Sequence, residues 1–213
     1  MKVYPLFLVG LDRRRSVVVG GDAEAERKVD GLLACAASVT VVAARPTPRL
    51  RDHAACGRLE WIERDYRSGD LRGAFLVIVT DRDEDVRAAA AAEAQREGAL
   101  VNVVDDVPRS GFVAGSVVRR GPLVVAISTS GCAPALAVRL RQRLERELGP
   151  EYGEFLECMG RLRRPLARLD FETRRELWYR LVDSEAIDDL RAGRKRSARR
   201  RIARIVSAAS TAG

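Results

Sequence analysis

Short apolar runs separated by amphipathic stretches constrain the fold of this chain more than any other feature. Strand-like runs are expected at residues 16–21, 38–44, 59–66, 73–80 and 99–106. Helical spacing of apolar residues is found between them, at residues 23–37, 50–57 and 83–98. Continuous apolar strands are typical of parallel sheets, and alternation with helices favours right-handed crossovers. The sequence therefore predicts an α/β fold with a Rossmann-like, doubly wound parallel sheet.

The pattern changes after Asp106. Two short strands are expected around Arg-Arg-Gly-Pro in GSVVRRGPLVVAIST, followed by an amphipathic helix in PALAVRLRQRLERELG, and the chain is helical and rich in Arg and Leu from Glu151 onward. We therefore expect three parts: a Rossmann-like dinucleotide-binding domain at 1–112, a small α+β segment at 113–150, and a helical C-terminal domain at 151–213 with a basic tail.

Positive charge gathers at the C-terminal end. The net charge is +8, and eight Lys and Arg residues follow Asp189 with no further acid, so residues 1–190 are formally neutral. A nucleic-acid-binding protein would carry its positive charge over a folded face, so this distribution argues against that function. Residues 191–213 are expected to be a solvated tail. A helix with Ile202, Ile205 and Val206 on one face is the alternative.

Composition also bears on location and metal binding. No apolar run reaches the roughly 18 residues that span a bilayer, and the N-terminal stretch does not match a secretory signal, so no membrane contact and a cytoplasmic location are expected. The four cysteines are widely spaced. His53, the only histidine, is expected at an exposed helix position. No metal site is predicted from these residues.

The stretch VVVGGDAEAERKV, residues 17–29, has the outline of a dinucleotide-binding turn. The three positions of that fingerprint make the turn, admit backbone to the pyrophosphate, and pack helix on strand. Here they are Gly20, Asp22 and Ala25. Asp22 places a carboxylate where a ligand diphosphate is expected. The site tolerates it if the side chain turns away and accepts backbone N–H bonds, or if it contacts a ribose hydroxyl, with Arg82 and Arg87 offsetting its charge.

Polar residues follow several of the predicted strands. Gly20, Thr80-Asp81 and Asp105-Asp106 all fall at strand ends. Ligands of open parallel sheets bind beyond the carboxyl ends of the strands, so these residues are expected to line one rim.

The order of motifs resembles the precorrin-2 dehydrogenase / sirohydrochlorin ferrochelatase family, the N-terminal module of siroheme synthase. The resemblance runs from about Tyr4 to Tyr152 and includes YPLFL, VVVGG, AERKV, NVVD and AISTSG followed by PALA. It implies NAD-dependent oxidation of precorrin-2 to sirohydrochlorin, with insertion of ferrous iron in some members. It also implies a homodimer, with residues 113–150 as the dimerisation segment.

Site residues follow from the rim and the resemblance together. Asp105 is the expected catalytic residue, a general base. The expected cofactor-binding residues are Gly20, Gly21, Asp22, Ala23, Glu24, Ala43, Ala44, Arg45, Thr80 and Asp81. A polycarboxylate substrate favours a cationic rim, so the expected substrate-binding residues are Ser128, Arg119 and Arg120. A solvated hairpin turn is the alternative for the two arginines.

Departures from the family pattern leave alternatives open. Asp22 replaces a glycine, Arg87 replaces a usual Asn, and Phe112–Ser116 lacks a usual proline. A non-catalytic tetrapyrrole- or nucleotide-binding homologue therefore stays an alternative, as does a turn or cap role for Asp105. The second strand ends in Ala43-Ala44-Arg45 without an acid for the ribose, so NAD is expected from the resemblance alone. For Arg45, acceptance of the 2′-phosphate of NADP and a solvated side chain are the two alternatives.

Overall fold

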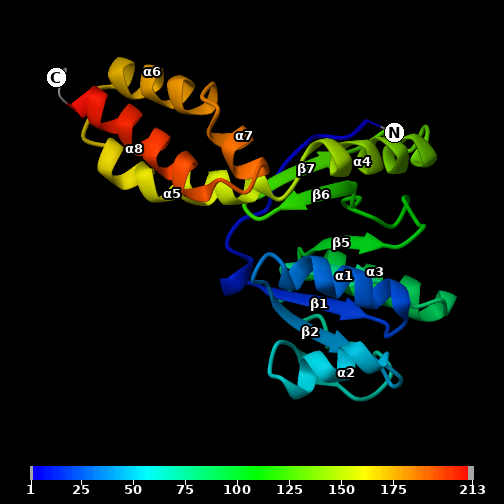
Figure 1. Ribbon diagram of the computed structural model, residues 1–213. Helices are drawn as coiled ribbons and strands as arrows, with labels where there is room; N and C mark the ends of the chain where they lie inside the picture. Colours follow the sequence, from blue (N-terminus) through cyan, green and yellow to red (C-terminus); the bar gives the residue numbers. More distant parts are fainter. Residues whose placement is uncertain (1, 211–213) are drawn as a thin grey trace. The chain divides into compact units, whose positions relative to one another are not determined.

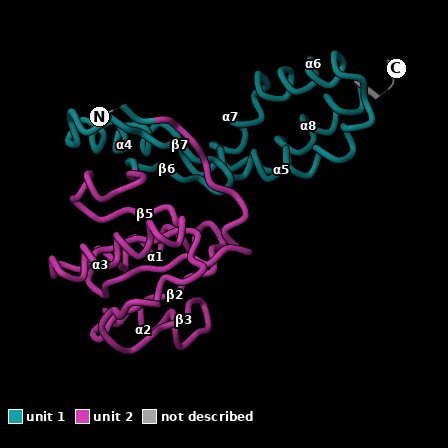
Figure 2. The backbone as a smooth tube through the Cα atoms, turned by 180° about the vertical axis from the view of Figure 1, so that it is seen from behind, with its two compact units in different colours: residues 1–3, 115–213 teal, residues 4–114 magenta. Residues whose placement is uncertain are grey.

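The computed structural model describes residues 2–210 and divides the chain into two compact units (Figure 1, Figure 2). One unit is formed by residues 4–114, and the other by residues 115–213 together with residues 1–3. The expected three-part division at residues 112 and 150 stays a prediction about folding domains.

The unit of residues 4–114 is a parallel sheet with helices on both faces (Figure 1). Its elements are a 3₁₀ helix (Leu11–Arg13), β1 (Arg15–Val19), α1 (Ala23–Leu33), β2 (Ser38–Val42), α2 (Pro48–Ala55), β3 (Glu60–Ile62), β4 (Leu76–Val79), α3 (Glu84–Arg96) and β5 (Leu100–Val103). The five strands pair in the order β3-β2-β1-β4-β5, all parallel. The predicted Rossmann-like sheet is confirmed. From β1, the chain adds β2 and β3 on one side of the sheet and then β4 and β5 on the other, so the strand order changes direction between β1 and β4.

Two apolar layers bury the sheet, one on each face. Val18 packs with Ala25 and Val29 of α1 on one face. Val17 and Val19 point to the opposite face, where alanines of α3 pack against them. Side chains alternate across a strand, so the run Val17–Val19 serves both layers. This double burial explains why the strands read as continuous apolar runs.

A buried carboxylate fixes the segment between β3 and β4. Glu93 of α3 is 4% exposed and accepts hydrogen bonds from the Tyr66 hydroxyl, from Leu71 N at 2.8 Å and from Gly69 N at 3.0 Å. Burial raises the pKa of Glu93, but these hydrogen bonds outweigh burial and hold it below the ordinary range. Burial and the bond to Glu93 raise the pKa of Tyr66.

The second unit combines a hairpin with helices. Its elements are β6 (Ser116–Arg120), β7 (Leu123–Ile127), α4 (Pro134–Glu147), α5 (Glu151–Leu166), α6 (Phe171–Val182), α7 (Ala186–Arg191) and α8 (Lys195–Ser210). The strands β6 and β7 pair antiparallel, as expected from the residues around Arg-Arg-Gly-Pro. Helices α5 to α8 share a core that includes Phe155, Met159, Leu177, Leu181 and Ile202. No helix within residues 2–210 is both long and apolar enough to cross a bilayer.

The expected solvated tail is wrong for residues 195–210, which form α8 and pack on the helical core. Asp189 is 4% exposed and explains the packing, because it accepts hydrogen bonds from Arg194, Ser197 and Arg201. The side chain of Ile202 is buried, which fits the alternative helix. Residues 211–213 lie outside the described part of the chain.

The expectation of an exposed His53 is also wrong. The side chain is 10% exposed, with Nε2 at 3.1 Å from Asp30 Oδ1 of α1 and Nδ1 at 3.2 Å from Arg58. His53 lies in α2, and its two polar partners let the imidazole be buried without an unsatisfied nitrogen. The sequence pattern did not reveal these partners because Asp30 is 23 residues away.

The Glu93 contacts generate a stability prediction. Glu93→Gln removes the buried charge that three donors share, and we expect it to lower the free energy of unfolding by about 2–3 kcal/mol at neutral pH. Because its folded pKa is lowered, the carboxylate stabilises the fold above pH ~4.3 and loses that contribution as the pH falls through the folded pKa. Urea unfolding at several pH values measures both effects.

Glu63→Gln is the matched control, since Glu63 is an exposed carboxylate in the same unit. Equal stability of the two variants at neutral pH would contradict the role assigned to Glu93.

Candidate functional site

The glycine turn follows β1, at the point where the strand order of the sheet changes direction between β1 and β4. Gly20 has φ +118°, and a Cβ added to it would lie 2.2 Å from the Thr80 hydroxyl and 3.1 Å from Asp81 N. A Cβ on Gly21 would lie 2.8 Å from both Ala43 Cβ and Pro46 Cα. Both positions therefore require glycine, because the turn packs directly against the residues that follow β4 and β2.

Asp22 closes the N-terminus of α1 with its own carboxylate. Its Oδ1 accepts hydrogen bonds from Glu24 N at 3.0 Å and from Ala25 N at 2.9 Å. Its Oδ2 lies 4.0 Å from the guanidinium of Arg82. The expected geometry, in which the side chain accepts backbone N–H bonds, is therefore present. The expected contribution from Arg87 is absent, because that guanidinium instead donates to the Val104 carbonyl at 3.1 Å.

A cavity of about 300 Å³ opens at this turn. Its walls come from the carboxyl ends of β1, β2 and β4 and from the segment after β3. It is lined by Gly20, Gly21, Asp22, Val42, Ala43, Ala44, Arg45, Asp65, Tyr66, Thr80, Asp81 and Arg82. This volume lies at the lower end of the range for small-molecule sites. The strand register explains the meeting, since Val19 is aligned with both Val42 and Val79.

The structure brings eight of the ten expected cofactor residues to this cavity, and Ala23 and Glu24 are not among its lining residues. Glu24 instead forms ion pairs with Arg27 and Lys28 on α1. Sequence reasoning missed Asp65 and Tyr66. The rule that found Thr80 also applies to them, because they follow the end of β3 at Ile62.

Asp105 follows the end of β5 in a left-handed turn. Its φ is +59°, its side chain is exposed, and Asp106 N donates to Val103 O at 3.1 Å to close the turn. Asp and Asn tolerate this backbone conformation better than most residues. The carboxylate is thereby displayed at the same edge of the sheet as Thr80, since Val79 is aligned with Val103.

Asp106 has a different environment from Asp105. Its carboxylate is hydrogen-bonded by the Arg109 guanidinium at 2.5 Å and by Arg109 N at 3.2 Å, and Arg87 lies 3.6 Å away. The hydrogen bond from Arg109 is the main cause that holds the pKa of Asp106 below its ordinary range. Asp106 therefore holds the turn in place through Arg109.

Lys28 is a charged neighbour of Asp105 that sequence reasoning missed. Its side chain is 22% exposed, and its ammonium lies 3.2 Å from Glu24 Oε1. Burial is the main cause that lowers the pKa of Lys28, Arg27 adds to this, and the negative charge of Asp105 opposes it. The carboxylate of Asp105 thus lies within electrostatic range of a half-buried ammonium.

The expected substrate residues belong to the second unit. Arg120 donates to Leu148 O and Glu145 O, each at 2.7 Å, and so caps the C-terminus of α4. Arg119 precedes it in β6 and is half-buried. Their alternative as a solvated hairpin turn is wrong, because both lie within a strand. Ser128 follows β7, and its hydroxyl accepts a hydrogen bond from Ser130 N at 3.1 Å.

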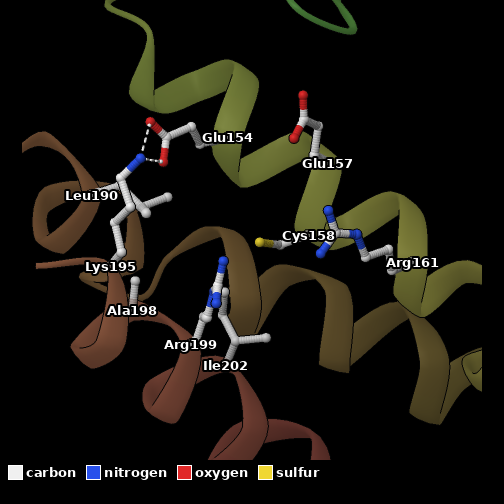
Figure 3. Close-up of a pocket in the computed structure, with 9 residues that line it drawn as sticks. All are labelled: Glu154, Glu157, Cys158, Arg161, Leu190, Lys195, Ala198, Arg199 and Ile202. Atoms are coloured by element: carbon white, nitrogen blue, oxygen red, sulfur yellow. Dashed lines mark hydrogen bonds and ion pairs between the residues drawn. The ribbon is translucent and has the colours of Figure 1, made fainter. Parts of the chain in front are cut away.

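A second cavity, of about 330 Å³, lies among α5, α7 and α8 (Figure 3). Lys195 pairs with Glu154 in its wall at 2.8 Å, and Cys158 is among the lining residues drawn there. None of the expected site residues lines it. The candidate functional site is therefore the cavity at the glycine turn together with the neighbouring Asp105.

The close packing of the turn generates a second prediction. Gly20→Ala forces a side chain against Thr80 and an L-residue into a strained backbone conformation, so we expect the free energy of unfolding to fall by about 2–3 kcal/mol. Gly31→Ala in α1 is the matched control, because an added Cβ meets nothing within 4 Å there. It should raise the free energy of unfolding by about 0.5–1 kcal/mol. Urea unfolding in which both variants match the unsubstituted chain would contradict the close packing.

Family models match the chain in three consecutive parts. An NAD(P)-binding model matches residues 7–116, a model described as sirohaem biosynthesis protein central matches residues 120–147, and a model described as sirohaem synthase dimerisation region matches residues 151–205. The first of these covers more than half of the chain and contains the whole cavity at the glycine turn.

Individual relatives give a consistent result. The chain is 40% identical to siroheme synthase 1 of Serratia proteamaculans over 163 residues, which are 76% of this chain and 34% of the relative. It is 35% identical to the siroheme synthase of Chromobacterium violaceum over 210 residues, 98% of this chain and 44% of the relative. The chain thus spans less than half of the length of these relatives.

A solved structure of SirC, precorrin-2 dehydrogenase, matches with a TM-score of 0.73 and 25% identity, and the match covers 96% of this chain and 100% of the other. The sheet order, the glycine turn and the three family models all lead to one assignment. This chain belongs to the NAD(P)-binding family whose model matches residues 7–116, and siroheme synthases are among its relatives.

Proposed function

We propose that this protein oxidises precorrin-2 to sirohydrochlorin with NAD as the hydride acceptor, a step of siroheme biosynthesis. The observation that carries the proposal is the pairing of a glycine cradle, where no Cβ fits at Gly20 or Gly21, with a displayed carboxylate at the same sheet edge. The similarity to siroheme synthases and to a precorrin-2 dehydrogenase supports it.

The residues present fit a dinucleotide. The backbone of Gly20 and Gly21 lines the cavity, where a pyrophosphate would approach it, and Arg45 and Arg82 supply positive charge there. Asp22 uses its carboxylate on the N-terminus of α1, so the charge that it adds is partly neutralised within the protein. When bound, NAD supplies the acceptor for the hydride. The protein holds it at the ends of β1, β2 and β4.

Asp105 is the group that we assign to the proton. Dehydrogenation removes a hydride from one carbon and a proton from a neighbouring atom, and a carboxylate within reach of that proton acts as the general base. The left-handed turn exposes the Asp105 side chain, whereas the neighbouring Asp106 is occupied by Arg109.

Iron insertion is the second reaction that we propose for Asp105. Chelation of ferrous iron removes two protons from the pyrrole nitrogens of the product, so the same carboxylate serves both steps. Ferrous iron is then a substrate of the protein rather than a resident metal. Anaerobic incubation of the protein with sirohydrochlorin, with and without ferrous iron, separates iron insertion from the oxidation.

A homodimer is the assembly that we propose, formed through the second unit. The dimerisation model matches residues 151–205 and not the segment 113–150 in which dimerisation was expected, and α6 within it exposes Phe171 at 65%, Tyr179 at 64% and Val182 at 52%. Exposed apolar side chains grouped on one element favour association with a partner. We also place the protein in the cytoplasm.

Asp105→Asn tests the proposed base. Asn tolerates the left-handed backbone at this position, so the variant should fold. We expect a fall of about 10²–10⁴-fold in NAD-dependent turnover of precorrin-2, measured anaerobically from the absorbance of sirohydrochlorin, while the Kd for NAD stays unchanged. Asp52→Asn, which changes an exposed carboxylate of α2, is the control.

Two results would contradict the proposal. Full turnover by Asp105→Asn would remove Asp105 from the mechanism. Absence of turnover in the unsubstituted, folded chain that still binds NAD or a tetrapyrrole would favour the alternative, a non-catalytic binding homologue.

A further inference from the structure

The cavity at the glycine turn contains one carboxylate without a protein partner. Asp22 accepts backbone hydrogen bonds at the start of α1, and Asp81 accepts one from Asp83 N at 2.9 Å. Within the described part of the chain, the exposed side chain of Asp65 forms no hydrogen bond or ion pair with another residue. Its carboxylate is therefore available to a ligand in that cavity.

Both neighbours of Asp65 are held in place. Arg64 forms two hydrogen bonds with the Asp70 carboxylate, both at 2.7 Å, and donates to the carbonyl of Asp65 at 3.1 Å. Tyr66 is fixed through its hydroxyl by the buried Glu93. The backbone at Asp65 is thus fixed from both sides, and little conformational entropy is lost when the carboxylate meets a ligand.

The position of Asp65 matches a function that is missing elsewhere. Dinucleotide sites of this type place an acid near the end of the second strand, where it accepts hydrogen bonds from the ribose hydroxyls of NAD. Here β2 is followed by Ala43, Ala44 and Arg45, without an acid. The strand β3 lies beside β2, with Ile62 aligned to Val42, and Asp65 follows Ile62 by three residues.

We infer that Asp65 selects NAD over NADP by accepting a hydrogen bond from the adenosine ribose. This inference rests on the proposed function, because it concerns the cofactor held there. A carboxylate accepts from a 2′-hydroxyl and repels a 2′-phosphate. Arg45 lines the same cavity and attracts phosphate, so it is the group that opposes this selection.

Binding of each nucleotide to the full-length chain tests the inference without turnover. Isothermal titration calorimetry gives the Kd for NAD and for NADP in the unsubstituted chain, in Asp65→Asn and in the control Asp52→Asn. We expect the unsubstituted chain and the control to bind NAD more tightly. Asp65→Asn should weaken NAD binding about tenfold and bring the two Kd values together. Arg45→Gln should weaken NADP binding more than NAD binding.

The outcomes separate the two proposals. A preference for NADP in the unsubstituted chain, or an unchanged preference for NAD in Asp65→Asn, would overturn the assignment of Asp65 and leave the proposed function standing. A folded chain that binds neither nucleotide would overturn both.

Discussion

At the ends of β1 and β4, the backbone of Gly20 approaches Thr80 so closely that a single added carbon would lie 2.2 Å from its hydroxyl. The contact sets the depth of the cavity, because the turn cannot move outward without separating from β4. Gly21 repeats the constraint toward Ala43 and Pro46, and Thr47 N donates to Gly21 O at 2.9 Å. One pair of glycines therefore positions three strand ends around a single opening.

Asp22 shows how such a site accommodates a residue that the common pattern lacks. Its carboxylate takes the N–H groups of Glu24 and Ala25, so the N-terminus of α1 is capped from within the chain. The dinucleotide fingerprint is thus divided between residues of different kinds. The glycines let the turn pack closely on the neighbouring strand ends, and Asp22 caps α1. Arg45 and Arg82 are the cations that line the cavity for an anionic ligand.

The local sequence pattern was sufficient to predict the parallel sheet, because its strands are apolar runs whose side chains are buried on both faces of the sheet. It was also sufficient for most of the cavity, because residues after strands β1, β2 and β4 must meet at one edge. It failed where a distant partner decides the outcome. The imidazole of His53 is buried because Asp30 of α1 binds it. The helix α8 packs on the helical core because Asp189 accepts hydrogen bonds from its basic segment, although a run of Arg and Ala by itself is typical of a solvated tail. Asp65 was missed for another reason: the strand expected at residues 59–66 runs past Ile62, where β3 ends, so Asp65 was assigned to the strand and not to its end.

The docking of α8 has a consequence for how the chain acquires its structure. The core shared by α5 to α8 needs Ala198 and Ile202, and the buried Asp189 needs donors from Arg194, Ser197 and Arg201. A ribosome that has completed α5 must still add more than thirty residues before these groups exist. The apolar face of α5 therefore stays incompletely covered during that interval of synthesis, whereas the local β-α-β pairings of residues 15–42 can already form.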